Sequence, residues 1–416
     1  MRIPVALLLV LLASAAYGDV FRILDDPRDA AQARVDVIQQ AEREIHALYF
    51  LARNDRITFA ALALLRDARR RGVPSVQLVV DANYHRIPKA VLAHLRDEGV
   101  EVRVYHPFTL RHPSWLFHRM HEKVVVVDGE RYITGGRNLA EAYFGMAKKN
   151  YVDRDVYVEG ASAEHADRHF ENVWSSAHVA ALKVSVSKEE KQFAARVLDE
   201  ALCGDFVTLN TGRDWSEGLK DVDAVNFWHD PVDDGTRVAV RLGDAIRNAK
   251  TSIVIESPYL IPSKNLLALL EKKLKEGVYV QIVTNSLRST DGLLPQAAYL
   301  KFRRRLARAG IDVREYKGPD PLHAKSAVID GRIVLVGSYN LSNRSENLNT
   351  EVMCMAEDEE LAQELLASID LHLQNAWKIR GNGQPPRRER YPNVSRAKVL
   401  RAWAWRLLLP IVEKQL

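Results

Sequence analysis

Apolar and polar positions along the chain follow two periods in turn, one typical of helices and the other of strands. From Phe59, apolar residues recur at helical spacing as far as Gly72, where a helix would end, and a valine-rich stretch follows. The same order begins again at Asn265, where the helical pattern ends at Gly277 and a β-rich stretch follows. Helices that alternate with strands in this way predict an α/β layer structure.

This order belongs to a repeat that covers most of the chain. Residues 41–50 and 249–260 each contain a helix end and an apolar strand, and residues 90–105 and 301–316 each add a helix and a strand. The repeat is far longer than that of a solenoid. We therefore predict two similar lobes related by a pseudo-twofold axis, with equivalent segments meeting at one cleft.

The 416 residues divide into five predicted segments. They are a signal peptide or uncleaved anchor (1–18), a first lobe (19–180), a helical connection (181–220), a second lobe (221–380), and a basic linker with an amphipathic helix (381–416). A chain of this length can bury the cores of two lobes.

A short polar motif closes the repeated pattern in the first lobe. His121 and Lys123 are two positions apart at the head of a valine strand, so both side chains point to the same face. Asp128 and the glycine after it form a strong hairpin signal. The returning strand leads to Asn138, and Glu141 three residues later completes the pattern of a helix N-cap.

The second lobe repeats every element of this motif, with His323, Lys325, Asp330 and Asn340 in the same order. Paired small residues precede each asparagine and allow a tight backbone path; they are Gly135, Gly136, Gly337 and Ser338. Two facing sets of imidazole, ammonium and amide groups fit a phosphodiester. One imidazole can attack phosphorus, the other can protonate the leaving oxygen, and the lysines and asparagines can hold the non-bridging oxygens. This arrangement needs no metal or other cofactor.

The duplicated H-x-K-x4-D-x6-G-G/S-x-N pattern resembles the signature of the phospholipase D superfamily. The resemblance implies the phospholipase D fold, with two lobes that are each a mixed β-sheet flanked by helices and an active site at their interface. It also implies a phosphohistidine intermediate without a metal cofactor. By analogy His121 is the nucleophile and His323 the acid, although the pseudo-symmetry makes the reverse chemically reasonable.

The acidic residues need separate treatment. Asp128 and Asp330 occupy hairpin turns away from the lysine face, so we interpret them as structural. A histidine nucleophile still needs an acidic partner to fix its tautomer. The resemblance implies an acid downstream of each motif, and the matching positions are Asp155 and Glu351, with Asp153 as the alternative to Asp155.

The sequence around the first motif resembles that of bacterial cardiolipin synthases and related phosphatidyltransferases, notably in "GGRN" followed by "YFG". The segment from Glu256 to Pro262 is similar to another of their sequences, but the two amino-terminal transmembrane helices of the best-known type are missing. We predict phosphatidyl transfer, as in a cardiolipin synthase, or phospholipid hydrolysis. The alternatives are an exported nuclease acting on DNA or RNA and a catalytically idle membrane-binding protein.

Both ends of the chain carry signals of location. The basic and then apolar start, followed by small residues, is typical of a secretory signal cut after Ala15 or Gly18, and an uncleaved anchor is the alternative. We therefore predict an exported, periplasmic and membrane-associated bacterial protein that is a monomer. The net charge of +5 suits an anionic partner, and we favour phospholipid over nucleic acid.

The last segment predicts a helix that binds the bacterial membrane surface. One face of this helix is apolar and contains Leu400, Trp403, Ala404, Leu407 and Leu408. Tryptophan, leucine and arginine together are typical of an interfacial element. Docking on the core of the protein itself is the alternative interpretation.

The sequence does not assign a role to the two cysteines or to the remaining histidines. Cys203 and Cys354 could pair or remain free thiols. The loop that contains His106, His112 and His118 could shape the cleft mouth, touch a membrane or be an ordinary surface loop. The sequence indicates no partner for a further group of histidines, which are His46, His165, His169 and His178.

Overall fold

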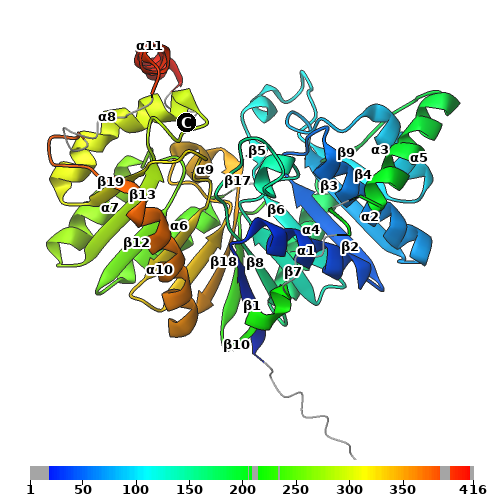
Figure 1. Ribbon diagram of the computed structural model, residues 1–416, viewed down its shortest axis with the longest axis horizontal. Helices are drawn as coiled ribbons and strands as arrows, with labels where there is room; N and C mark the ends of the chain where they lie inside the picture. The colour runs from blue at the N-terminus through cyan, green and yellow to red at the C-terminus, as the bar shows by residue number, and fades with distance from the viewer. Residues whose placement is uncertain (1–17, 205, 209–213, 233–234, 385–393, 413–416) are drawn as a thin grey trace, which may run out of the picture.

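The computed structural model describes residues 18–204, 206–208, 214–232, 235–384 and 394–412. Apart from Gly18, the predicted signal peptide lies outside the described residues, as does most of the linker before the last helix. The described chain forms two lobes side by side, each built on one large sheet flanked by helices (Figure 1).

The first sheet has nine strands. In spatial order they are β10 (Lys220–Val222), β1 (Asp19–Leu24), β8 (Asp155–Glu159), β7 (Arg131–Gly135), β6 (Lys123–Val127), β2 (Glu44–Tyr49), β3 (Ser75–Asp81), β4 (Glu101–Tyr105) and β9 (Val179–Ala181). The pairs β2–β3 and β3–β4 are parallel and the others are antiparallel, so the sheet is mixed.

The second sheet has eight strands and repeats this plan. Their order is β11 (Val225–His229), β18 (Val352–Glu357), β16 (Ile333–Gly337), β15 (Ser326–Ile329), β12 (Ser252–Glu256), β13 (Tyr279–Asn285), β14 (Asp312–Tyr316) and β19 (Ala376–Lys378). Here β12–β13 and β13–β14 are the parallel pairs. The predicted α/β fold with two similar lobes is therefore confirmed.

Helices cover the sheets on both faces. The outer helices are α1 (Pro27–Gln39), α2 (Arg56–Arg71), α3 (Lys89–Asp97) and α5 (Lys188–Leu202) on the first lobe, and α6 (Arg237–Asn248), α7 (Lys264–Lys275) and α8 (Leu293–Ala309) on the second. Helices α4 (Ala163–Ser175) and α10 (Glu359–Gln374) pack instead into a core between the two sheets. The segment between the lobes places α5 against α2 and α3, and β10 extends the first sheet.

The core between the sheets contains residues of both lobes. Phe21 and Val158 of the first lobe belong to the same buried cluster as Phe227 and Val334 of the second. Burial of apolar surface from both halves stabilises their mutual arrangement. The two motifs are thus held relative to each other by a continuous core, so packing as well as chain connectivity fixes their arrangement.

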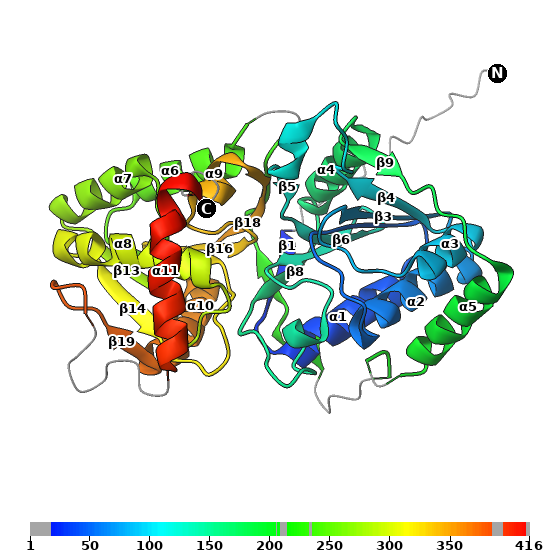
Figure 2. The ribbon, with the colours of Figure 1, turned by 90° about the horizontal axis from the view of Figure 1, so that it is seen from above.

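The last helix, α11 (Arg396–Val412), lies across α8 on the second lobe (Figures 1 and 2). Ala402 and Leu409 are buried, and Leu409 packs with Ile261 and Ala298. The predicted apolar face points elsewhere, because Leu400, Trp403, Ala404 and Leu407 are exposed; the side chain of Leu408 lies outside the described set. The helix therefore docks on the protein through its opposite side and leaves the predicted face uncovered.

Candidate active site

The two hairpin aspartates have the structural role that their turn positions predict. Asp128 and Asp330 adopt positive φ angles of 57° and 54°. Each carboxylate accepts hydrogen bonds from three successive backbone N–H groups, those of Glu42, Arg43 and Glu44 in the first lobe and those of Lys250, Thr251 and Ser252 in the second. Each aspartate thereby fixes the loop that enters a parallel strand, β2 or β12.

Two short backbone contacts between the lobes position the histidines. Strand β5 (Arg119–Met120) pairs in parallel with β17 (Asn349–Thr350), and the N–H of His121 donates to the carbonyl of Thr350 at 3.0 Å. In the same way Val152 forms a bridge with Leu322, and the N–H of His323 donates to the carbonyl of Val152 at 2.7 Å. Each histidine therefore lies beside a segment of the opposite lobe.

The acid that contacts each histidine also comes from the opposite lobe. Nδ1 of His121 lies 2.9 Å from Oε2 of Glu351, and Nδ1 of His323 lies 2.6 Å from Oδ2 of Asp153. All four side chains are buried, with the two imidazoles 10% and 7% exposed. A carboxylate on Nδ1 favours the tautomer that leaves Nε2 free as a nucleophile or base. The two crossed pairs make one site out of two motifs.

The prediction of Asp155 as the acid of the first motif is wrong. Its carboxylate lies 2.8 Å from a guanidinium nitrogen of Arg34 in α1 and accepts a hydrogen bond from the N–H of Arg137 at 3.2 Å. Asp155 pairs with Gly135 inside the sheet, whereas Asp153 lies two residues earlier, next to the bridge between Val152 and Leu322 of the other lobe. Asp153, the alternative, is the residue that reaches His323.

Small residues make room for these acids. A Cβ atom on Gly136 would lie 2.0 Å from Oδ1 of Asp153, so only glycine fits there. The equivalent Ser338 donates a short hydrogen bond to Glu351, and Ser345 donates another at 2.6 Å. The small residue before each asparagine therefore lets the acid approach the backbone closely, and Ser338 in addition donates a hydrogen bond to Glu351.

Both lysines of the motifs are buried beside their histidines. Nζ of Lys325 lies 2.8 Å from Nδ1 and 3.2 Å from Nε2 of His323, and Nζ of Lys123 donates to the carbonyl of His121. Burial lowers the pKa of Lys123 to about 7 and that of Lys325 to about 8, although Glu351 and Asp153 oppose this shift. A bound anion would favour their charged forms.

The two histidine–acid pairs differ in their ionisation. Burial and the charges of both lysines hold the pKa of His121 well below its usual range, and burial and Lys325 lower that of His323. Burial also raises the pKa of Glu351, to about 7. For Asp153 the charges of His323 and Lys325 outweigh the effect of burial and hold the pKa well below its usual range.

The two asparagines are not the helix N-caps that their spacing predicts. Ala140 precedes the short 3-10 turn Glu141–Tyr143, and Ser342 caps α9 (Asn343–Asn347). The side chain of Asn138 accepts from the N–H of Leu51 and donates to the hydroxyl of Tyr143. The Oδ1 atom of Asn340 is buried without a hydrogen-bond partner among the described residues. Both lie beside the motifs, but on loops.

The chain matches the family described as "Cardiolipin synthase, PLD-like domain" over residues 35–174 and 242–372, which gives one match in each lobe. It belongs to this family. The prediction of a phospholipase D superfamily enzyme is thereby confirmed.

Individual relatives agree with the family match. Cardiolipin synthase C of Escherichia coli (strain K12) is 29% identical over 411 residues, covering 86% of this chain and 85% of the relative. Minor cardiolipin synthase ClsB of Bacillus subtilis (strain 168) is 27% identical over 348 residues, covering 82% and 78%. The phosphatidylserine synthase structure from Haemophilus influenzae Rd KW20 has a TM-score of 0.70 at 17% identity and covers 95% of both chains, which supports the fold.

Aromatic rings surround the two histidines of this family member. The ring of Phe50 meets His121 edge-on at a centroid distance of 4.8 Å. Tyr143 and Tyr151 lie against His323 at 5.2 Å and 5.1 Å. These rings restrict the orientation of the imidazoles and limit access of water. Sequence reasoning did not identify them, because aromatic residues after strands are common in any core.

Two histidines without evident partners in the sequence have partners in the structure. His169 of α4 binds the carboxylate of Glu122 at 2.7 Å. Glu122 stands between His121 and Lys123, just before β6 begins. Nε2 of His106 contacts Nδ1 of His178 at 2.7 Å, and its ring stacks on Trp115 at 4.5 Å. These contacts fix the segments beside the first motif. They join residues that are far apart in the chain, so the sequence did not indicate them.

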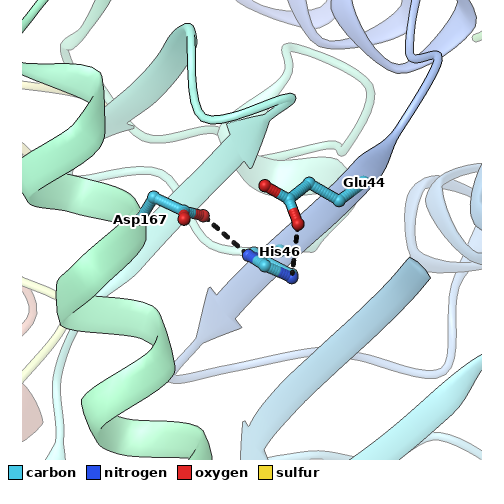
Figure 3. Close-up of side chains that lie close together, drawn as sticks. All are labelled: Glu44, His46 and Asp167. Atoms are coloured by element: carbon cyan, nitrogen blue, oxygen red, sulfur yellow. Dashed lines mark hydrogen bonds and ion pairs between the residues drawn. The ribbon is translucent and has the colours of Figure 1, made fainter. Parts of the chain in front are cut away.

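His46 lies in a cluster of carboxylates under α4 (Figure 3). Its Nδ1 contacts Asp167 at 2.7 Å, while Nε2 lies 3.8 Å from Glu44 and 3.6 Å from Glu171. Ligand atoms of Glu44, His46 and Asp167 all lie within 4.8 Å of one another, close enough for a cation. The His46 ring stacks on Phe170 at 4.2 Å, so the cluster joins β2 to α4.

The two cysteines are free thiols. Cys203 is exposed, and Cys354 is buried with its sulfur 3.2 Å from the hydroxyl of Tyr132 in the other lobe. The alternative of a disulfide between them does not occur in this structure. Cys354 instead contributes to the packing between the lobes.

Proposed function

We propose that this protein transfers the phosphatidyl group of a phospholipid to an alcohol through a phosphohistidine, as in a cardiolipin synthase, with hydrolysis as the reaction when water is the acceptor. The observation that carries the proposal is the crossed arrangement of two histidine–carboxylate pairs with a buried lysine beside each. Membership of the cardiolipin synthase family supports phospholipid as the substrate class.

In this mechanism Nε2 of His121 attacks phosphorus and the bond to the leaving alcohol breaks. His323 gives that alcohol a proton, and then removes one from the incoming alcohol. The ionised Asp153 opposes the lowering of the His323 pKa by burial and Lys325, so His323 is the more easily protonated of the two histidines, which suits an acid. His121 has the more strongly lowered pKa and faces Glu351, whose own pKa is raised, which suits a neutral nucleophile.

Lys123 and Lys325 supply the positive charge that the transferred phosphoryl group needs in the transition state. With pKa values of about 7 and about 8, Lys123 is partly protonated and Lys325 is mostly protonated near neutral pH. The negative substrate favours the protonated form of both lysines when it binds. Charge compensation by these side chains makes the proposed reaction independent of a metal.

We also infer an exported protein that rests on the bacterial membrane through α11. Four of its apolar side chains, Leu400, Trp403, Trp405 and Leu407, are between 38% and 67% exposed. None of the helices in the described parts of the chain combines the length and apolarity of a membrane span. Surface binding through an amphipathic helix would bring the cleft to its substrate.

The test is incubation of purified protein with labelled phosphatidylglycerol and separation of the products. Cardiolipin supports the transferase, and phosphatidic acid alone supports a lipase. Inertness towards phospholipid together with cleavage of DNA or RNA would refute the lipid proposal. Removal of α11 by ending the chain at residue 394 should lower activity on vesicles more than activity on short-chain soluble lipid.

A further inference from the structure

An open hollow of about 750 Å³ lies in the first lobe, at the ends of β2 and β3. Its walls include Leu51, Arg53, Tyr84, Arg86 and Glu141. None of these residues belongs to either motif. The volume is in the range of small-molecule sites.

Residues of the wall of this hollow contact the aromatic residues that lie against the two histidines. Tyr84 packs on Phe50 at 4.2 Å, and Phe50 in turn contacts His121. On the other side, the carbonyl of Ala142 accepts the N–H of Tyr151, whose ring lies against His323. The hollow is therefore separated from each histidine by one aromatic residue, Phe50 on the side of His121 and Tyr151 on the side of His323.

The hollow offers positive charge to a ligand. The exposed Arg53 guanidinium makes no hydrogen bond or ion pair with the described residues. Arg86 is held in the wall by hydrogen bonds from Nη1 to two backbone carbonyls. The nearby acids are already engaged, because Asp55 accepts from two backbone N–H groups and Glu141 pairs with Arg56. A phosphate would be the natural partner of the arginine pair.

We propose that this hollow binds the glycerophosphate headgroup of the acceptor phospholipid, with Arg53 on its phosphate and Arg86 beside it. The inference rests on the proposed phosphatidyl transfer. The donor phosphate must lie between the histidines, next to the lysines. The acceptor hydroxyl must lie beside His323, and its own phosphate then lies one glycerol unit further away. Arg53 lines the hollow together with Ala142, whose carbonyl binds the N–H of Tyr151, and the ring of Tyr151 lies against His323.

In the transfer step the acceptor oxygen forms a bond to phosphorus while the bond from phosphorus to Nε2 of His121 breaks. The proton of the acceptor hydroxyl goes to His323, which had given a proton to the first leaving alcohol. His121 and His323 thereby return to their starting states. The hollow contributes by holding an anionic acceptor in place of water.

The experiment compares two acceptors with the full chain in mixed micelles of phosphatidylglycerol. Cardiolipin reports transfer to a lipid acceptor, and the phosphatidyl ester of added 1-butanol reports transfer to an acceptor without a phosphate. Arg53→Glu should lower cardiolipin formation by about tenfold or more, since a charge-assisted contact is lost. Formation of the butanol ester should stay at the wild-type level, and Arg53→Lys should retain most of the cardiolipin.

Arg247→Glu, an equivalent charge change on exposed α6, serves as the matched control and should change neither product. Equal losses of both products in Arg53→Glu, or no loss of either, would overturn the inference. Arg53→Gln replaces Arg53→Glu if the latter does not fold. A wild-type protein that cleaves no phosphatidylglycerol would instead refute the proposed function, so the two failures are distinguishable.

Discussion

Asp153 and Glu351 occupy equivalent places in the two lobes, each one residue beyond a backbone contact between the lobes, but their surroundings differ. Asp153 accepts from the N–H of Arg154 at 2.8 Å and faces an imidazole with a lysine beside it. Glu351 accepts from two serine hydroxyls, and its backbone N–H donates to the carboxylate of Asp230 at 3.0 Å.

This difference changes the ionisation of the two acids. The pKa of Asp153 lies below its usual range because of adjacent positive charge, whereas burial raises those of Glu351 and Asp230 to about 7. Two carboxyl groups close together cannot both ionise easily. A duplicated fold therefore does not give duplicated chemistry, and the inequality supports an acid at His323 and a nucleophile at His121.

The strongest test of this inequality removes each imidazole. His121→Ala should lose turnover by at least about 10⁴-fold on every substrate, because no nucleophile remains. His323→Ala should lose about 10²- to 10⁴-fold on phospholipid, but recover on a nitrophenyl phosphodiester, whose leaving group needs no proton. Steady-state rates on both substrates provide the measurement. Recovery in His121→Ala instead would reverse the two roles.

The next largest effect should separate the two acids. Asp153→Asn should lower kcat by roughly 10³-fold, because His323 loses the charge that stabilises its protonated form. Glu351→Gln should cost only about tenfold at neutral pH, where the carboxyl is already partly protonated. Single-turnover rates of the two variants provide the measurement, and equal losses would contradict the inequality.

The pH dependence of kcat/KM tests the ionisation of Glu351. As pH rises through about 7, Glu351 ionises and can accept a hydrogen bond from Nδ1 of His121, which should raise wild-type kcat/KM. Lys123 and Lys325, with pKa values of about 7 and about 8, lose protons over the same range, so the profile should be bell-shaped with Glu351 on its ascending limb. Glu351→Gln should lack this ascending limb. A melting temperature equal to that of the wild type would show that the variant is folded and that the change lies in the titration. A limb that persists in the variant would assign the titration to another group.

A smaller effect on activity and a larger one on stability distinguish Asp155 from Asp153. Asp155→Asn breaks a buried ion pair with Arg34, which should cost about 3–5 kcal/mol in the free energy of unfolding. Its kcat per folded molecule should stay near the wild-type value, because Asp155 contacts neither histidine. Denaturant unfolding and active-site titration measure the two quantities. A large loss of kcat in the folded variant would contradict the placement.

The smallest expected difference lies between the two turn aspartates. Asp128→Ala should cost about 2–3 kcal/mol in the free energy of unfolding, because partly buried N–H groups lose their acceptor. Asp330→Ala should cost about 1 kcal/mol, because its donors are more exposed to water. Thermal melts of both variants provide the comparison, and equal costs would show that solvent does not replace the lost acceptor in the second lobe.

Much of the fold could be predicted because its signals are local. Gly72 ends α2 in a left-handed conformation, and the Asp128 and Asp330 turns join paired strands as the hairpin signal indicates. The histidines and lysines could also be found, since they repeat at fixed spacing. The side of α11 that docks could not, because an apolar face fits a membrane or a neighbouring helix equally well.

The acid of the first motif shows where local signals fail. In the sheets Gly135 pairs with Asp155 and Gly337 pairs with Met353, so the true equivalent of Glu351 is two residues before Asp155. The chain between motif and acid is longer in the first lobe, which hides this register in the sequence. Only the ladder of hydrogen bonds reveals it.

By itself the sequence determined the duplication, the α/β architecture and the identity of the two His-Lys motifs, because these depend on periodicity and spacing within each half. The tertiary structure decided which acid serves which histidine. His121 pairs with Glu351 and His323 pairs with Asp153, because parallel backbone contacts between the lobes place each acid beside the histidine of the opposite lobe. A pairing between residues 170 and 230 positions apart is set by packing, and no local pattern encodes it.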